Sequence, residues 1–155
     1  RVQFPLEVSR LLAKYAIEPW QLIFEVTECS TFCNAEQALH ILRQLQKMGV
    51  RIAIDDFGTG YASYARLKSV DADILKIDGS FIRNIVNNSL DYQIVASICH
   101  LARMKKMLVV AEYVESEEIR SAVHALGIDY VQGYLIGRPV PLESLPEAEA
   151  SCADA

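Results

Sequence analysis

The chain has 155 residues, of which 52% are hydrophobic, and this size and composition fit one domain with a sizeable core. Its formal net charge is -5 and it has no basic run, which argues against a DNA or RNA partner, because nucleic-acid sites need clustered Lys and Arg. No apolar stretch approaches the roughly 20 residues of a membrane helix and the first residues lack a signal-peptide pattern, so we expect a cytoplasmic location.

The first third of the chain is expected to alternate helices and strands. Apolar residues at helical spacing predict a helix over Leu6–Tyr15, and a strand follows at Gln21–Val26. A second helix begins after Asn34, which can cap it, and ends at Gly49. Arg51–Ile54 is then predicted as the second strand.

The middle of the chain continues this alternation. A loop at Asp55–Gly60, a short helix near Tyr61–Leu67 and a strand at Ile74–Ile77 are expected in turn. The longest helix follows, and its core-facing stripe is predicted to consist of Leu90, Ile94, Ile98 and Leu101.

The last third adds two more strands. Met107–Ala111 is predicted as the fourth strand, and Ser116 caps a helix over Glu117–Leu126. Tyr130–Val131 opens the fifth strand, and the Ala- and Glu-rich residues 142–155 are expected to fray.

This order of elements predicts an α/β fold in which about five parallel strands are covered by helices. A closed barrel of eight such units takes about 250 residues, so we expect an incomplete TIM-like (β/α) barrel. An open doubly wound sheet has the same strand count and stays an alternative. The barrel is favoured because no glycine-rich phosphate loop follows any strand and because all five strands end in polar residues.

The polar strand ends are the main indication of function. They consist of Glu25, Glu28, Asp55, Asp56, Lys76, Asp78, Glu112, Glu115 and Gln132. One acid at a strand end is usually a helix cap or a solvated loop residue. Five polar ends in one parallel sheet instead predict a shared site, because the carboxyl ends of the strands lie together and buried acids need a partner or a metal.

The carboxylates favour a divalent-metal centre. Hard oxygen donors suit Mg²⁺, Mn²⁺ or Ca²⁺, so Glu25, Asp55 and Asp56 are candidate ligands. Adjacent aspartates can serve two ions in the arrangement that activates water for attack on a phosphate. Glu112 would complete the ligand set of the second ion or take the proton of the water, and Lys76 would stabilise negative charge.

The segment DDFGTG is predicted to form a mobile element beside the ligand, because its glycines permit positive φ. Its candidate loop residues are Phe57, Gly58, Thr59 and Gly60. The triplet Asp-Phe-Gly also occurs in protein kinases, but the other kinase motifs are missing and we discard that interpretation. The cysteines, which lack metal-site spacing, are predicted to be reduced and mostly buried thiols: Cys29, Cys33, Cys99 and Cys152.

In chain order, the segments FEVTE, IAIDDFGTGYAS, DILKID, VVAEYVE and VQGYLIGRPVP resemble the EAL domain, a bacterial phosphodiesterase module that linearises cyclic di-GMP. The likeness runs from about Pro5 to Pro141, and five motifs in the same order are far more specific than any one of them. It implies that residues 1–155 are the C-terminal part of a single EAL domain. The complete domain would be a TIM-like barrel with two Mg²⁺ or Mn²⁺ ions, acting in bacterial signalling and biofilm control.

The resemblance also implies roles for the first polar strand ends. Glu25 would bind metal, and Glu28 would steady the DDFGTG loop. Asp55 would bridge the two ions and Asp56 would bind one of them.

The later strand ends receive roles in the same way. Lys76 would hold or polarise the attacking water, and Glu112 would bind the second ion or act as the base. Gln132 would support the water, whereas Asp78 and Glu115 are similar to motif positions that line the site.

Two departures from the family pattern stand out. The Glu-Ala-Leu motif and an Asn-bearing strand, which supply two further metal ligands, would precede Arg1. Tyr113 stands where the family usually has Gly, and its side chain could crowd the ligand or restrict the backbone.

Two functions from different classes follow from the resemblance. The first is metal-dependent hydrolysis of cyclic di-GMP to linear pGpG by the parent domain, with the isolated chain inactive. The alternative is a degenerate EAL module that binds cyclic di-GMP or partner proteins as a sensor without catalysis. In either case we expect a homodimer and upstream GGDEF or sensory domains.

Overall fold

The structure is a computed structural model, and it describes residues 3–27, 35–58, 67–68 and 70–145. Several sequence predictions therefore lie outside the described residues. They concern Glu28, Thr59, Gly60, most of the helix near Tyr61–Leu67, the end of the tail, Cys29, Cys33 and Cys152.

Five parallel strands form one sheet, and their order in the sheet is their order in the chain. The strands are β1 (Ile23–Thr27), β2 (Arg51–Phe57), β3 (Ile74–Ile77), β4 (Leu108–Ala111) and β5 (Tyr130–Val131). A doubly wound sheet reverses its strand order at a switch point, and no reversal occurs among these five strands. Strands that follow one another without reversal are the arrangement of a TIM-like barrel, as predicted.

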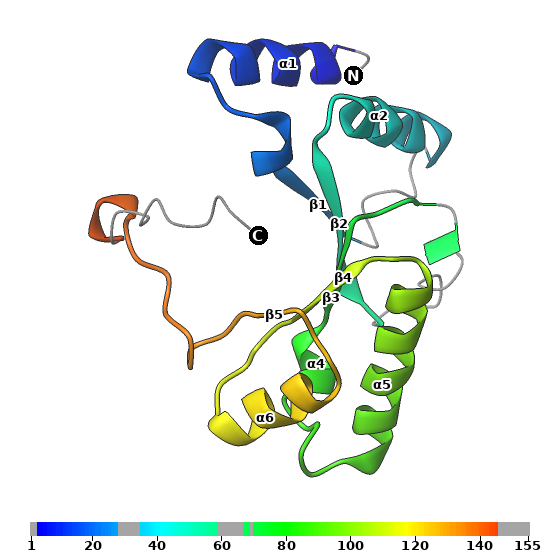
Figure 1. Ribbon diagram of the computed structural model, residues 1–155, viewed down its shortest axis with the longest axis vertical. Helices are drawn as coiled ribbons and strands as arrows, with labels where there is room; N and C mark the ends of the chain where they lie inside the picture. Colours follow the sequence, from blue (N-terminus) through cyan, green and yellow to red (C-terminus); the bar gives the residue numbers. More distant parts are fainter. Residues whose placement is uncertain (1–2, 28–34, 59–66, 69, 146–155) are drawn as a thin grey trace, which may run out of the picture.

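Helices alternate with the strands and pack around the sheet, as Figure 1 shows for α2, α5 and α6. The described helices are α1 (Phe4–Tyr15), η1 (Pro19–Gln21), α2 (Ala35–Lys47), α4 (Gly79–Ile82), α5 (Ser89–Met104), α6 (Glu117–Ala125) and η3 (Leu142–Ser144). Within the described ranges, none of the helices has the length and apolar character needed to span a bilayer.

The register of the sheet separates an apolar face from the face that carries Glu25 and Lys76. Ile54 pairs with Leu75 and Leu75 pairs with Val109, so these three side chains point to the same face. All three are at most 2% exposed, and they belong to the hydrophobic core beneath the helices. Glu25 and Lys76 lie on the opposite face. Along β1, the exposed residues of that face alternate with half-buried residues on the core side.

Two aspartates fix neighbouring strands in the same way. Asp73, directly before β3, accepts a hydrogen bond from the backbone N–H of Ile52 at 2.8 Å. Asp129, directly before β5, accepts one from the backbone N–H of Val109, also at 2.8 Å. Both hydrogen bonds lie near the amino ends of the strands and join the start of one strand to the start of the preceding one, so they help to fix the register of the sheet.

The structure corrects one loop prediction. Phe57 lies in β2 and is 1% exposed, so it belongs to the core rather than to a mobile loop. Gly58 follows the strand with φ 108°, which confirms the predicted positive φ at that position.

The stripe predicted for the longest helix is also partly wrong. Leu90, in the first turn of α5, is 66% exposed, and Val95, Cys99 and Ala102 are buried beside Ile98 instead. The free thiol of Cys99 is buried, as expected. Ser116 caps α6 as predicted, since its hydroxyl accepts a hydrogen bond from the backbone N–H of Ile119.

Candidate functional site

A β-bulge at the end of β2 brings two adjacent carboxylates to one place. Ile54 pairs with Leu75 and Phe57 pairs with Ile77, so Asp55 and Asp56 together stand opposite Lys76 alone. Asp56 has φ 54°, in the left-handed region, which interrupts the alternation of side chains along the strand. Without the bulge, two successive aspartates would point to opposite faces.

The bulge places both aspartates beside a glutamate from another strand end. One carboxylate oxygen from each of Asp55, Asp56 and Glu112 lies within 4.8 Å of the other two. Glu112 directly follows β4, and its backbone N–H donates to the carbonyl of Ile77 at the end of β3. We call these three residues the acidic cluster.

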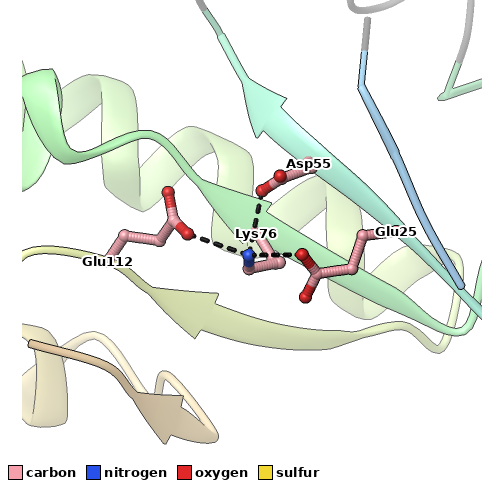
Figure 2. A network of polar contacts seen from close by, with 4 residues as sticks. All are labelled: Glu25, Asp55, Lys76 and Glu112. Carbon is pink, nitrogen blue, oxygen red and sulfur yellow. Dashed lines mark hydrogen bonds and ion pairs between the residues drawn. The ribbon is translucent and has the colours of Figure 1, made fainter. Parts of the chain in front are cut away.

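Lys76 lies at the centre of the site and is the one strongly buried charged side chain in the described core, at 6% exposure. Its Nζ atom lies 3.0 Å from Glu25 Oε2, 3.0 Å from Asp55 Oδ1 and 2.9 Å from Glu112 Oε1. Figure 2 shows the three carboxylates approaching this ammonium group from β1, β2 and the end of β4. The sequence predicted this convergence of separate strand ends, and the structure confirms it.

The carboxylates keep Lys76 protonated. Burial lowers the pKa of a lysine, but here the ion pairs with Glu112, Glu25 and Asp55 outweigh burial, and the pKa of Lys76 is raised above its ordinary value. At neutral pH the side chain is therefore a hydrogen-bond donor and a positive charge. It does not serve as a base.

In two acids of the cluster, by contrast, the shift of the pKa favours the neutral form over the charged form. Burial raises the pKa of Glu112, against the lowering effect of Lys76. Burial raises the pKa of Asp56 as well, and the charge of Asp55 adds to this effect. Both shifts mean that burial disfavours the charged form of these acids, and for each of them the charge of Asp55 acts in the same direction.

A divalent cation fits this charge distribution. Oδ1 of Asp55 is buried and lies 3.0 Å from Lys76 Nζ, yet within the described part of the chain no donor approaches it in the direction of a hydrogen bond. An oxygen in this state has lone pairs that a metal could use. The acidic cluster offers three hard oxygen ligands, which suit Mg²⁺ or Mn²⁺. Glu25 is half exposed and reaches Lys76 rather than the cluster.

A cavity of about 580 Å³ adjoins the acidic cluster. It is lined by Asp56, Asp78, Arg83, Glu112, Tyr113, Glu115, Gln132, Gly133 and Tyr134. The predicted residues Asp78, Glu115 and Gln132 thus lie beside the two cluster members that also line it. A cavity of this size accommodates a small organic ligand.

Asp78 has a structural role in addition to its place in the cavity wall. Its carboxylate accepts a hydrogen bond from the backbone N–H of Ser80 at 2.8 Å and caps the short helix α4. Sequence reasoning missed α4 and, with it, the cavity residue Arg83, which directly follows the helix. The available signal for this helix was the motif DGS directly after a strand, because Asp can cap a helix and the small Gly follows it.

The chain matches known sequences and structures over most of its length. The model of the EAL domain matches residues 1–139. The chain is 74% identical over 150 residues to the cyclic di-GMP phosphodiesterase PdeF of Escherichia coli K12, a match that covers 96% of this chain and 20% of PdeF. It is 45% identical over 138 residues to MucR of Pseudomonas aeruginosa, named a bifunctional diguanylate cyclase and cyclic di-GMP phosphodiesterase.

Solved structures of such proteins have the same fold. The complex of the MucR phosphodiesterase with cyclic di-GMP superposes with a TM-score of 0.80 at 45% identity, covering 88% of this chain and 55% of that one. BlrP1 of Klebsiella pneumoniae, solved with manganese and cyclic di-GMP, gives a TM-score of 0.78 at 34% identity, covering 83% of this chain and 33% of that one. The chain spans about a fifth of the length of the curated relatives that it matches.

Proposed function

The chain belongs to the EAL domain family, and from that premise we propose that the complete domain hydrolyses cyclic di-GMP to linear pGpG at the acidic cluster beside Lys76. The observation that carries the proposal is the convergence of Asp55, Asp56 and Glu112 next to a cavity large enough for a nucleotide. The phosphodiesterase names of PdeF and MucR support it.

Asp55, Asp56 and Glu112 would hold Mg²⁺ or Mn²⁺ in this proposal. When bound, such an ion polarises a phosphate oxygen and lowers the pKa of a water. The manganese in the BlrP1 complex supports this choice of metal class. Glu25, which the family resemblance assigns as a ligand, would bind only after parting from Lys76.

The reaction consumes one water and breaks one phosphodiester bond. The water oxygen forms a new bond to one phosphorus atom, the bond from that phosphorus to the ribose O3′ breaks, and the O3′ leaving group takes up a proton. The protonated Lys76 would donate a hydrogen bond to the water or to a phosphate oxygen and stabilise its developing negative charge. Where Glu112 does not hold the ion, its raised pKa suits it to accept the proton of the water instead.

The remaining predicted residues would support the ligand. Gln132 and Glu115 line the cavity and offer hydrogen-bonding groups to it. Glu28 would steady the loop that contains Gly58, Thr59 and Gly60, as the family resemblance implies.

The experiment that tests the proposal uses the full-length protein. It is incubated with cyclic di-GMP and Mg²⁺, Mn²⁺ or a chelator, and the products are identified by mass spectrometry. We expect pGpG with either metal and none with the chelator. Binding of cyclic di-GMP with no product under any metal condition would contradict hydrolysis and support the alternative of a sensor module.

One observation favours the sensor alternative. Tyr113 brings a bulky ring next to Glu112, and it holds a strained backbone with φ 54°. The acidic cluster and Lys76 oppose this alternative, because a module that only binds its ligand has no need for three acids around a buried ammonium group.

The proposal extends to assembly. The chain covers 55% of the solved MucR chain, so we expect the isolated 155-residue chain to lack part of the site and to be inactive. β1 and β5 are the outer strands of the described sheet, and such edges favour pairing with a second copy, which supports a homodimer. The diguanylate cyclase activity in the name of MucR supports an upstream GGDEF domain.

A further inference from the structure

Tyr113 joins the two strand ends that carry Lys76 and Glu112. It directly follows Glu112 of the acidic cluster, and its ring lies against α4, which begins two residues after the end of β3. Lys76 belongs to β3, and its Nζ atom lies 2.9 Å from Oε1 of Glu112. The ring contact and this ion pair therefore connect the same two strand ends, one through α4 and the other directly.

Helix α4 holds the ring of Tyr113 on one of its faces. A Cβ atom at Gly79 would lie 2.0 Å from Cδ2 of Tyr113, so only glycine leaves room for the ring at this position. The backbone N–H of Arg83 donates to the carbonyl of Gly79 at 2.9 Å, which places the two residues one helical turn apart on the same face. The guanidinium carbon of Arg83 lies 4.1 Å from the ring centroid, in a cation–π contact. The ring is thus engaged by α4 at two points.

The backbone of Tyr113 needs these contacts. Its φ is 54°, in the left-handed region, which is unfavourable for a residue with a Cβ atom. The residue is 46% exposed and gains little from burial, so among the described contacts those with Gly79 and Arg83 offset this strain. The left-handed residue turns the chain immediately after Glu112. The contacts that hold the turn therefore also hold the backbone on which the Glu112 carboxylate stands.

The chain is anchored on its other side by the segment after β5. The backbone N–H of Val114 donates to the carbonyl of Gln132 at 3.0 Å, and the carbonyl of Val114 accepts from the N–H of Leu135 at 3.2 Å. A Cβ atom at Gly133 would lie 2.2 Å from the carbonyl oxygen of Val114, so the two backbones are in close contact. Tyr113 supplies the matching anchor on the side of α4.

We propose that Tyr113 is a positioning residue, whose ring, held by Gly79 and Arg83, keeps the carboxylate of Glu112 in place for a divalent cation. A glutamate that is already held loses less side-chain freedom when it binds an ion. Groups that orient a metal ligand typically contribute about 10- to 100-fold to metal affinity. The inference rests on the proposed function, since it takes Glu112 as a ligand of Mg²⁺ or Mn²⁺.

The first test measures the Mn²⁺ affinity of the full-length protein by calorimetry, without nucleotide. Tyr113→Asn removes the ring but suits the left-handed backbone, because asparagine adopts this region more readily than most residues with a side chain. We expect the affinity to fall about tenfold. Tyr113→Phe keeps the ring and should retain the affinity of the parent. Tyr15→Asn, at an exposed tyrosine of α1 whose ring contacts Lys14, is the matched control away from the site.

A second measurement follows the backbone itself in the metal-free protein. Hydrogen exchange with mass spectrometry should show a loss of amide protection at residues 112–115 in Tyr113→Asn, and no such loss in Tyr113→Phe. Protection that is lost equally over the whole domain would mean that the ring stabilises the fold in general, and would overturn the positioning role. Unchanged protection at these residues would overturn it as well.

The kinetics of cyclic di-GMP hydrolysis at saturating Mn²⁺ separate positioning from contact with the nucleotide. In Tyr113→Asn we expect kcat to fall about tenfold while KM changes less than about twofold, because the ring acts through Glu112. A rise in KM at constant kcat would overturn the inference. Tyr113→Gly, which also suits the backbone, replaces Tyr113→Asn if that variant folds poorly.

The outcomes distinguish this inference from the proposed function. If the parent binds Mn²⁺ and forms pGpG, and Tyr113→Asn binds Mn²⁺ as tightly as the parent, the positioning role is wrong and the proposed function stands. If the parent neither binds Mn²⁺ nor forms pGpG, the proposed function and this inference fail together.

Discussion

Nζ of Lys76 lies 2.9 Å from Oε1 of Glu112, although the two residues belong to different strand ends and both side chains are nearly buried. The same ammonium group contacts Asp55 and Glu25, so one positive charge partly neutralises three acids. This arrangement predicts what happens when its parts are changed.

Replacing Lys76 by Met should destabilise the metal-free protein. The change leaves the acids of the site without their shared partner, and loss of one member of a buried ion pair typically costs about 3 kcal/mol. Urea unfolding of the full-length protein measures the difference. Arg120→Gln is the control, because Arg120 and Glu117 form an exposed ion pair for which we expect less than about 1 kcal/mol. Equal losses for the two variants would show that Lys76 is not needed to balance the acids.

Replacing Asp55 by Asn should lower phosphodiesterase turnover about 100-fold, since a neutral amide is a much weaker metal ligand than a carboxylate. Titration of Mn²⁺ by calorimetry should show a matching loss of affinity. Asp71→Asn is the control, because the side chain of Asp71 is 97% exposed. It should leave the turnover and the affinity for Mn²⁺ as they are in the parent. An unchanged Mn²⁺ affinity in Asp55→Asn would exclude Asp55 as a ligand.

The stabilisation of the folded protein by Mn²⁺ should decrease as the pH falls. The pKa values of Glu112 and Asp56 are raised in the folded protein, so these acids bind protons more tightly there than in the unfolded chain. In the absence of metal they favour folding at acid pH, and this contribution is lost as the pH rises through their raised pKa values. Protons compete with Mn²⁺ for the same oxygens. The increase in Tm caused by Mn²⁺ should therefore shrink as the pH falls toward the raised pKa values of these two acids.

Differential scanning fluorimetry with and without Mn²⁺ measures this increase in Tm. In Glu112→Gln, which has one titrating group fewer, the Mn²⁺-induced increase in Tm should depend less on pH. A metal-induced shift that is the same across the pH range would mean that these carboxylates do not bind the ion.

The contact between Gly79 and Tyr113 predicts a coupled pair of substitutions. Gly79→Ala places a methyl group where the ring of Tyr113 lies, and such overpacking typically costs about 1–3 kcal/mol. In the background of Tyr113→Gly the same substitution should cost much less, because the ring is gone. A double-mutant cycle by urea unfolding measures this coupling. Gly137→Ala has no atom within 4 Å of the added methyl group and serves as the control.

Much of the fold could be predicted from the sequence because the apolar residues follow the periods of strands and helices. β3 has the predicted bounds and β5 begins at the predicted residue, and the polar ends of β1, β2, β3 and the segment after β4 meet as expected. The fold class followed from the alternation of elements, and the strand order confirms it.

The details that were missed depend on long-range packing. The bulge at Asp55 and Asp56 extends β2 to Phe57, and it arises from pairing with β3 rather than from local propensity. Leu90 fits a helical stripe, but it lies in the first turn of α5, where the helix leaves the core. The contact between Gly79 of α4 and the ring of Tyr113 joins residues more than 30 positions apart, which no local pattern reveals.

The most direct test of the metal centre is anomalous X-ray scattering from crystals of the full-length protein grown with Mn²⁺ and cyclic di-GMP. We predict a manganese peak in contact with carboxylate oxygens of Asp55, Asp56 and Glu112, and a phosphate of the nucleotide beside it. A peak that contacts none of these three residues, or no peak at all at saturating Mn²⁺, would contradict the account.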